Sequence, residues 1–317
     1  MATPDNRTLV QKADLALAEL TSGGGVKQPV SANFIRIMID ASVLLPEVRT
    51  IPMAEPIQKI PNVGFLSSVL RKASDGVALS VGDRAKPDLG SVTLTTSLLK
   101  AECRITEGQL EDNVEGDRFQ ALVGEELMKA AGRDLENLVI NGDTTLTTHA
   151  YLGTFDGLLK LTTTNSVDLT GAAAIIGRDH AKALMQTLPA QFQQNKAAMR
   201  FYTSYDAEIK QRSLLADRGT AMGDVMVASE VPVMLLGVPL KGVPLFPTTL
   251  NAAGASNETN ILYCNPKESI VVGIQRNMEM RLWEEPRQDG IFLIVKMKVA
   301  CKFGYEPAVA KAIKVII

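Results

Sequence analysis

The side chains that most often do chemistry in proteins are few in this chain and lie far apart. The two histidines, His149 and His180, are not spaced as metal ligands, and we expect each to lie at the surface or to cap a local segment. The three cysteines, Cys103, Cys264 and Cys301, are odd in number and include no CxxC pair. We interpret them as small apolar side chains in a reducing compartment, and not as a metal site or a disulfide framework.

Two pairs of adjacent acidic residues, Glu125-Glu126 and Glu284-Glu285, could in principle share a proton. Neighbouring residues in a helix or a turn point apart, however, so a shared-proton dyad is not favoured. The sequence also lacks GxSxG, HExxH and DxDxG motifs, and the glycines at 23–25 lack the context of a phosphate-binding loop. The sequence therefore predicts no catalytic, cofactor-binding or metal-binding residue and no enzyme activity. An enzyme with no recognisable motif remains a remote alternative.

The overall composition is that of an ordinary globular protein. The chain has 317 residues, a net charge of −2 and 46% hydrophobic residues, enough for one large or two ordinary domains. A dedicated nucleic-acid binder normally has a strong basic bias, so only a local patch could face nucleic acid. No apolar run approaches the roughly 20 residues that cross a bilayer, and the N-terminus lacks the apolar core of a secretory signal. We therefore expect no membrane partner and a protein that is cytoplasmic when made.

One long amphipathic helix is predicted between residues 105 and 143. Apolar residues recur in steps of three, one and four over about 24 residues, which gives a rod of roughly 36 Å. The residues expected on its buried stripe are Phe119, Leu122, Val123, Leu127, Ala130, Ala131, Leu135, Leu138 and Val139. The residues expected largely outside the stripe are Glu125, Glu126, Lys129, Arg133, Glu136 and Asn137. Two interior glycines each weaken the helix by about 1 kcal/mol, so tertiary packing must hold it.

The first third of the chain contains two segments that cannot bury their apolar residues locally. A short amphipathic segment at 7–20 ends at three glycines, and we expect a mobile arm that docks elsewhere. Residues 54–90 are rich in Gly, Pro, Ser and charge, and they connect a strand ending at 53 to a strand predicted over 91–103. Because an isolated two-stranded hairpin is at best marginally stable, this one should fold back on its own chain or lie on a neighbouring subunit.

The middle of the chain is predicted to alternate helices with strands. Residues 178–195 have helical spacing that Pro189 interrupts, and residues 197–203 form a short buried strand. Ser204 is then expected to cap a helix over 205–217. Three apolar residues of this helix are expected to point inward: Ile209, Leu214 and Leu215.

Two strands near the C-terminus are predicted to form a long hairpin. Residues 269–283 and 290–302 alternate apolar with polar side chains, and about 13 residues at roughly 3.3 Å each give a length of about 43 Å. Glu279 should then lie within one or two register steps of Lys296. Lys296 and Lys298 lie on a strand face that is either solvated or in contact with acidic residues of another copy. The sequence leaves both interpretations open.

Several stretches carry a family resemblance through their order along the chain. They are 45–53 (LPEVRTIPM), 86–94 (KPDLGSVTL), 105–112 (ITEGQLED), 134–143 (DLENLVINGD) and the hairpin at 270–303. Together with the arm, the projecting hairpin and the long helix, this ordered set covers nearly the whole chain from about residue 30. On this basis the chain resembles the major capsid proteins of tailed bacteriophages, which have the Hong Kong 97-like fold.

The resemblance implies an α+β fold with four parts. The long helix would be the spine of a peripheral domain, and the excursion would be an extended loop that overlaps a neighbouring subunit. The implied parts are an N-terminal arm (1–37), the peripheral domain (38–54, 96–145 and 266–303), the extended loop (55–95) and an axial domain (146–265 and 304–317).

The resemblance also implies a function. Major capsid proteins self-assemble, through hexamers and pentamers, into an icosahedral head shell that encloses double-stranded DNA. We therefore expect a homo-oligomer in the virion, assembled in the host cytoplasm and in non-specific contact with packaged DNA. A scaffolding protein and a portal are further expected partners, and a decoration protein is a possible one. An encapsulin, a nanocompartment shell that encloses an enzyme, is the alternative with the same fold.

Such a shell requires contacts between subunits, and charged residues in the extended loop and near the turn of the long hairpin are the candidates. They are Arg71, Lys72, Arg84, Lys86, Glu279, Glu284, Glu285, Lys296 and Lys298.

Overall fold

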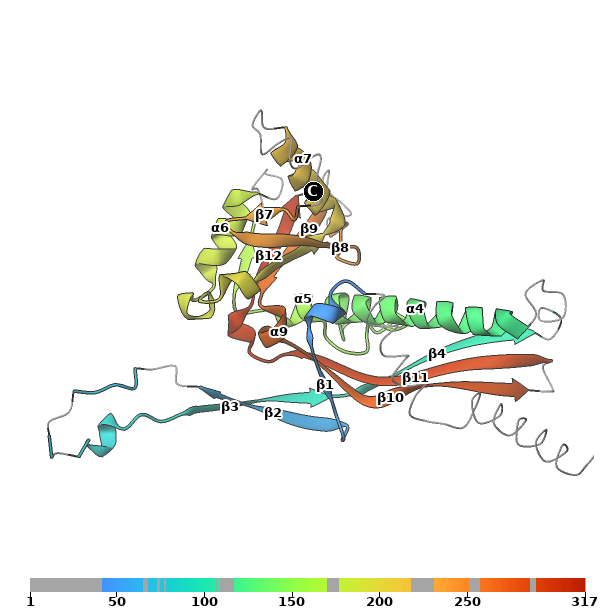
Figure 1. Ribbon diagram of the computed structural model, residues 1–317, viewed down its shortest axis with the longest axis horizontal. Coiled ribbons are helices and arrows are strands. Elements are labelled where there is room, and N and C mark those ends of the chain that lie inside the picture. The colour runs from blue at the N-terminus through green and yellow to red at the C-terminus, as the bar shows by residue number, and fades with distance from the viewer. Residues whose placement is uncertain are drawn as a thin grey trace, which may run out of the picture. The chain divides into compact units, whose positions relative to one another are not determined.

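The computed structural model describes residues 42–64, 68–72, 75–76, 78–106, 108, 117–169, 177–217, 231–250, 257–285 and 289–316. These residues form helices and strands in a mixed α+β arrangement (Figure 1). The predicted N-terminal arm, residues 1–37, lies outside the described part of the chain. In that described part, every helix is too short or too polar to cross a membrane.

The chain divides into two compact units, each built from segments that are distant in sequence. The first comprises Met1–Pro46, Ser97–Glu136 and Ile274–Val299, and the second comprises Glu47–Thr96, Asn137–Gly273 and Ala300–Ile317. The long helix and both long C-terminal strands run through the two units. Neither unit can therefore form before remote parts of the chain meet.

Helix α4 (Asp117–Asn141) is the predicted long helix, and its 25 residues agree with the predicted length. Its C-terminal half is buried as predicted, with at most 8% exposure at Ala131, Leu135, Leu138 and Val139. Two expectations about its faces are wrong. Leu122, expected on the buried stripe, is 45% exposed, and Glu136, expected outside it, is 3% exposed.

A four-stranded sheet has the order β1-β10-β11-β4. Its strands are β1 (Arg49–Pro52), β4 (Ser97–Thr106), β10 (Ile270–Glu285) and β11 (Gly290–Phe303). Strands β10 and β11 confirm the predicted hairpin, and with 16 and 14 residues they are longer than predicted. Helix α4 packs on β10 near Gly124, where a Cβ would lie 3.4 Å from the sulfur of Met280, an ordinary contact distance.

Strand β11 pairs with β4 in antiparallel register, from Gly290 opposite Thr106 to Val299 opposite Ser97. The predicted alternation in β11 is confirmed, because one set of alternate residues is buried. That set is Leu293, Val295, Met297, Val299 and Cys301, each at most 5% exposed. Lys296 lies between them with an exposed side chain, and Lys298 is half-buried.

The sequence predicts a single strand over residues 91–103, but the structure divides it. Strand β3 (Asp88–Thr95) ends before Thr96, and β4 begins after it. The backbone N–H of Thr96 donates a hydrogen bond to the carbonyl of Pro56 at 2.9 Å. At this residue the chain leaves one sheet and enters another, so the apolar alternation does not continue. Leu94 is fully buried, whereas Leu98 is 61% exposed.

Strands β2 (Ile57–Gly64) and β3 form a separate two-stranded antiparallel ribbon. Its register runs from Ile57 opposite Thr95 to Gly64 opposite Asp88, which confirms the predicted hairpin. Figure 1 shows the ribbon continuing past its last paired residues into the segment that contains the short helix η2 (Val81–Asp83). At the other end of β3, Leu94 packs with Met53, Val271 and Ala300. Among the described residues, the ribbon therefore joins a hydrophobic core at this end.

A six-stranded mixed sheet has the order β5-β12-β9-β6-β8-β7. Its strands are β5 (Ser166–Asp168), β6 (Arg200–Ser204), β7 (Met234–Leu235), β8 (Val238–Val243), β9 (Glu258–Cys264) and β12 (Ala310–Ile316). Strand β12 is parallel to β5 and antiparallel to β9, while β6 is antiparallel to β9 and parallel to β8. The aromatic rings of Phe201 and Tyr263 stack across β6 and β9 at 4.6 Å.

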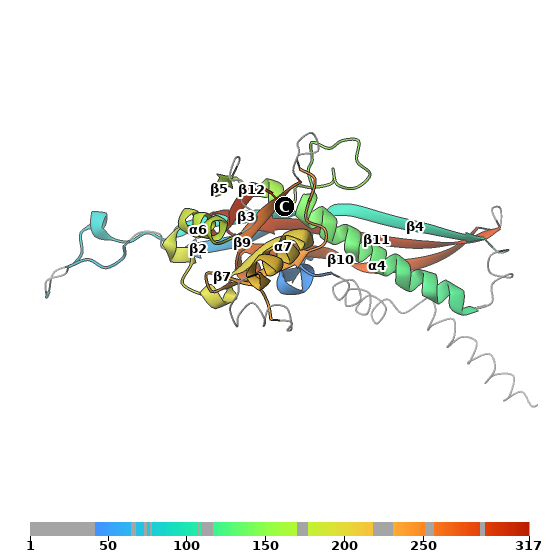
Figure 2. The same cartoon turned by 90° about the horizontal axis from the view of Figure 1, so that it is seen from above.

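Two helices, α6 (Arg178–Thr187) and α7 (Tyr205–Ala216), share one hydrophobic core with this sheet (Figure 2). Pro189 follows the end of α6, as predicted. The predicted cap of α7 is also confirmed, since the Ser204 hydroxyl accepts a hydrogen bond from the N–H of Ala207 at 3.4 Å.

The expected inward face of α7 is wrong in part. Ile209 is 50% exposed and Leu214 is 42% exposed, whereas Leu215 does pack against the core. Ala207 and Gln211, one helical turn apart, are buried instead. A Cβ on Gly242 of β8 would lie 3.0 Å from the Cα of Tyr205, so the backbones of α7 and β8 lie close together. Small side chains at this contact set the buried face, and hydrophobicity alone does not.

Short elements complete the described part of the chain. They are η1 (Leu45–Glu47), α5 (Leu158–Leu161), η3 (Ala190–Phe192), η4 (Lys196–Ala198), α9 (Pro266–Ser269) and η6 (Glu306–Ala308).

Candidate inter-subunit contacts and polar clusters

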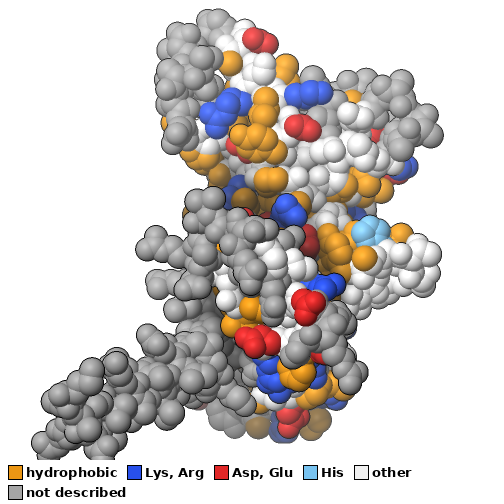
Figure 3. Space-filling view, turned by 90° about the vertical axis from the view of Figure 1, so that its right-hand side faces the viewer, with side chains coloured by type: hydrophobic (Ala, Val, Ile, Leu, Met, Phe, Trp, Pro, Cys, Tyr) orange, Lys and Arg blue, Asp and Glu red, His pale blue; other side chains and the backbone are white. Residues whose placement is uncertain are grey.

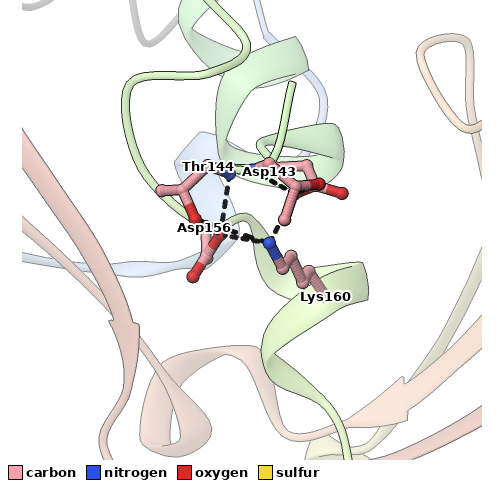
Figure 4. Close-up of polar contacts among 5 residues, drawn as sticks. Asp143, Thr144, Asp156 and Lys160 are labelled. Carbon is pink, nitrogen blue, oxygen red and sulfur yellow. Dashed lines mark hydrogen bonds and ion pairs between the residues drawn. The ribbon is translucent and has the colours of Figure 1, made fainter. Parts of the chain in front are cut away.

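A compact polar cluster lies just after the end of α4 (Figure 4). The ammonium group of Lys160 in α5 donates a hydrogen bond to the carboxylate of Asp143 and lies 3.0 Å from Oδ1 of Asp156. The same Asp156 oxygen accepts hydrogen bonds from the N–H and the hydroxyl of Thr144, at 2.9 and 2.8 Å. The hydrogen bond from Lys160, with others from Thr145, lowers the pKa of Asp143 to about 2. Both carboxylates are therefore neutralised by a fixed cation, which suits a structural clamp and not a general base.

The clamp closes a surface loop between two glycines. The N–H of Gly157 donates to the carbonyl of Gly142 at 2.8 Å, and the N–H of Asp143 donates to Leu152 at 2.9 Å. A Cβ on Gly142 would lie 2.3 Å from the carbonyl oxygen of Phe155, so no larger residue fits. The compact loop carries the exposed residues 144–150.

Glu136 is a buried structural residue that the helical pattern misassigns. Its buried carboxylate accepts hydrogen bonds from the backbone N–H groups of Val43, at 2.9 Å, and Leu44. The carboxylate thereby holds the first described residues of the chain against α4.

A half-buried carboxylate serves the six-stranded sheet. Glu47 accepts hydrogen bonds from the Tyr202 hydroxyl and, at 2.8 Å, from the ammonium group of Lys241. Burial acts to raise the pKa of Glu47, but the hydrogen bonds from Lys241 and Tyr202 outweigh it and lower the pKa. Burial also raises the pKa of Tyr202 far above its ordinary value. The group is a fixed structural network with no reactive member.

The histidines and cysteines do not assemble into a site. His149 is exposed, but His180 is 4% exposed in α6, so its expected surface or capping role is wrong. Cys264 and Cys301 are buried as predicted, and burial raises the pKa of the Cys301 thiol to about 12. Within the described ranges, no three His, Cys, Asp or Glu side chains are grouped so that they could hold a metal ion.

The four predicted contact residues of the extended loop are all exposed: Arg71, Lys72, Arg84 and Lys86. Arg71 lies 3.9 Å from Asp83, and both side chains are about half exposed, so the pair contributes little stability. Every described residue from 68 to 86 is exposed, and Leu70 reaches 90%. This segment presents cations and apolar side chains that its own chain does not cover.

The predicted contact residues near the long hairpin lie on β10 and β11, and no contact among the described ones is seen within one copy. Glu284 is exposed, and the carboxylate of Glu285 accepts a hydrogen bond from the Trp283 indole at 3.2 Å. Lys296 lies opposite Lys100 in the β11–β4 register. The side chain of Glu279 and the turn residues 286–288 lie outside the described part, so the expected approach of Glu279 to Lys296 stays a prediction.

Exposed apolar side chains mark the same regions. Trp283, the single tryptophan of the chain, is 60% exposed, and its neighbour Leu282 is 46% exposed. On the face drawn in Figure 3, basic and acidic side chains of the described residues are interspersed and do not form one large patch of either sign. Uncovered apolar groups among mixed charges are typical of surfaces that meet another protein.

A cavity of about 720 Å³ lies within the second unit, between the ribbon and the segments around η3, η4, α9 and η6. Most of its polar side chains are amides: Asn62, Gln191, Gln194, Asn195 and Asn265. Nothing in the sequence pattern indicates it, because its lining comes from five separate segments.

The chain matches the model of a family described as the phage capsid family over residues 23–316. It is 32% identical to the prophage capsid protein YqbE of Bacillus subtilis (strain 168) over 312 residues, which cover 98% of this chain and 99% of that protein.

Solved capsid structures share the fold. The satellite phage P4 procapsid that includes the size determination protein matches with a TM-score of 0.65 and 13% identity, covering 98% of each chain. The holo-SrpI encapsulin complex from Synechococcus elongatus PCC 7942 matches with a TM-score of 0.58 and 13% identity, covering 86% of this chain and 87% of that one. The described architecture is thus the predicted α+β capsid fold.

Proposed function

This chain belongs to the phage capsid family and is a major capsid protein, and we propose that its copies form the icosahedral head shell of a tailed phage around double-stranded DNA. In this role the protein is a component of the virion. The shell is a homo-oligomer, with hexamers and pentamers as its building blocks.

The observation that carries the proposal is the ribbon β2–β3 with its exposed outer segment. A two-stranded ribbon is at best marginally stable by itself, and here Leu70 and Val81 are 90% and 76% exposed. A neighbouring subunit that covers this segment would stabilise the ribbon and would also bury these two apolar side chains.

We assign four parts to the subunit on this basis. The N-terminal arm is 1–37, and the extended loop is 55–95. The peripheral domain takes 38–54, 96–145 and 266–303, with α4 as its spine, and the axial domain takes 146–265 and 304–317. The two compact units support separate bodies, although they group the loop with the axial segments.

The charged residues of the loop and the hairpin are the proposed contacts between subunits. In the loop, Arg71, Lys72, Arg84 and Lys86 are exposed and can meet acidic groups of another copy. Near the hairpin turn the corresponding residues are Glu279, Glu284, Glu285, Lys296 and Lys298. Each such pair is weak at a surface, but every copy in a shell repeats it.

The other proposed partners follow from the same role. With a net charge of −2, attraction to packaged DNA must be local, non-specific and strongly dependent on salt. A scaffolding protein and a portal would direct assembly in the host cytoplasm, and a decoration protein could bind the finished shell.

An encapsulin-type shell is the second candidate, because an encapsulin shares the fold. The 32% identity to a prophage capsid protein across nearly the whole chain favours the phage role. A catalytic role is not proposed, since the half-buried carboxylate of Glu47 and the buried carboxylate of Glu136 are occupied by hydrogen bonds.

Electron micrographs and sedimentation of the purified protein test the proposal. We expect hexamers, pentamers or closed shells, and shells isolated from an induced host should contain double-stranded DNA. A protein that sediments as a single 34.1 kDa species under all assembly conditions would contradict the proposal. Shells that enclose an enzyme in place of DNA would favour the encapsulin.

A further inference from the structure

The cavity in the second unit has the chemistry of a site for a cation. Glu268 of α9 is the one charged side chain among the described residues that line it, and no lysine or arginine is present there. The exposed carboxylate of Glu268 has no ion pair within the described part of the chain. The lining thus offers a negative charge that no described residue of its own copy neutralises.

A buried acceptor in the same wall points to a missing hydrogen-bond donor. Asn265 is 7% exposed, and its Oδ1 has no hydrogen-bond partner among the described residues. A buried amide oxygen without a donor typically costs about 1–3 kcal/mol. The carboxylate of Glu268 lies three residues further along α9, at the same cavity. A positively charged group with several N–H donors would pair with this carboxylate, and Oδ1 of Asn265, which has almost no accessible surface, would accept a hydrogen bond only after its amide turned toward the cavity.

The apolar part of the lining suits the same kind of group. Phe192 and Tyr305 lie 5.4 Å apart, with ring planes tilted by 49°. Both line the cavity together with the sulfur-containing side chain of Met199. Aromatic rings attract a cation, and they also cover the methylene groups of a lysine or arginine side chain.

We infer that this cavity receives a basic side chain from the extended loop of a second copy of the chain. The occupant follows from charge and from exposure. Within 68–86 the described residues Arg71, Lys72, Arg84 and Lys86 outnumber Asp75 and Asp83, and all of them are exposed. None of the four cations lines the cavity of its own copy. The inference rests on the proposed shell, which brings second copies into contact, and it names the surface that the loop would bind.

Charge reversal with rescue tests the inference. Glu268→Arg should raise the subunit concentration needed for shell assembly roughly tenfold or more, as expected for the loss of a charge-assisted hydrogen bond. One of four loop changes, Arg71→Glu, Lys72→Glu, Arg84→Glu or Lys86→Glu, should restore assembly when combined with Glu268→Arg. The matched control is Asp217→Arg, at an exposed residue of the same unit that lies outside the extended loop and does not line the cavity. It should assemble normally.

A second measurement locates the contact directly. Glu268→Cys is paired in turn with a cysteine at each of the four loop positions, and assembled shells are treated with a short thiol-to-thiol cross-linker. The half-exposed Cys103 is first changed to serine, while the buried Cys264 and Cys301 stay. We expect chain-to-chain cross-links for at least one pair.

The outcomes separate this inference from the proposed function. Shells that form normally with Glu268→Arg, or double variants that give neither rescue nor cross-link, overturn the inference and leave the capsid role intact. If the unaltered protein never forms shells, the proposed function fails and the inference fails with it. Thermal unfolding of the unassembled Glu268→Arg subunit should match the unaltered protein, because the side chain is exposed.

Discussion

Glu136 of α4 accepts a hydrogen bond from the backbone N–H of Val43 at 2.9 Å, through a carboxylate that is almost completely buried. The contact joins residues that are 93 positions apart. Through this contact, a charged residue that the helical pattern places at the surface holds the segment that precedes β1 in place.

Glu136→Ala should destabilise the subunit by about 2 kcal/mol or more, because it leaves buried backbone donors without an acceptor. Thermal unfolding measures the loss. Glu136→Gln keeps an acceptor oxygen and should cost less. Glu125→Ala, at an exposed position of the same helix, is the matched control and should change stability little. Equal effects of Glu136→Ala and Glu125→Ala would show that the buried contact does not contribute.

Gly142→Ala should prevent the loop after α4 from closing. The added methyl group would lie 2.3 Å from the carbonyl oxygen of Phe155, which is backbone and cannot move away cheaply. We expect a loss of soluble protein or a large drop in melting temperature. Gly82→Ala is the control, since the nearest atom to its Cβ is a hydroxyl oxygen 3.9 Å away. A Gly142→Ala subunit with unchanged melting temperature would refute the close crossing.

Stability should fall in mildly acidic solution because of His180. Burial lowers the pKa of this side chain below its ordinary value of 6.5. The unfolded chain therefore binds a proton below about pH 6.5 while the folded chain does not, so stability is fully present above that pH and is lost as pH falls.

The expected slope is at most about 1.4 kcal/mol per pH unit. Chemical denaturation at pH 7.5 and pH 5.5 measures it. His180→Leu should remove this part of the pH dependence, whereas His149→Leu, at an exposed position, should keep it. An unchanged slope in His180→Leu would assign the effect to other groups.

The extended loop should be cut by trypsin in free subunits and protected in shells. Arg71, Lys72, Arg84 and Lys86 are all exposed in a single copy, and few local contacts oppose opening there. Mass spectrometry of limited digests of both states identifies the cut bonds. Equal protection of these bonds in subunit and shell would mean that the loop packs on its own chain.

Assembly should shift the fluorescence of the single tryptophan. Trp283 is 60% exposed near the end of the long hairpin, so its emission should move to shorter wavelength when a neighbour covers it. Trp283→Phe provides the blank for tyrosine emission. An emission maximum that is the same in subunits and in purified shells would place the end of the hairpin outside the interfaces.

Local sequence patterns predicted several of the elements, although not the break between β3 and β4 at Thr96. The apolar repeat predicts α4 to within a residue or so of its length, Ser204 predicts the start of α7, and Pro189 predicts the end of α6. These features depend on hydrogen bonds and steric limits within one or two turns of chain. The order of the elements along the chain was then enough to predict the capsid fold, because that order is itself a property of the sequence.

Only the tertiary structure decided where the covered faces depart from the predicted ones. Leu98 and Leu122 have apolar side chains in phase with a buried stripe, yet both are exposed, while Glu136 and His180 are buried. Burial depends on which remote segment lies against a side chain, and a periodic pattern contains no information about that segment. The cavity around Asn265 could not be predicted from the sequence for the same reason, since its lining residues range from 61 to 308. In a shell, other copies of the chain can cover Leu98 and Leu122. An apolar pattern that indicates a core in a monomer can therefore indicate an interface in a shell subunit.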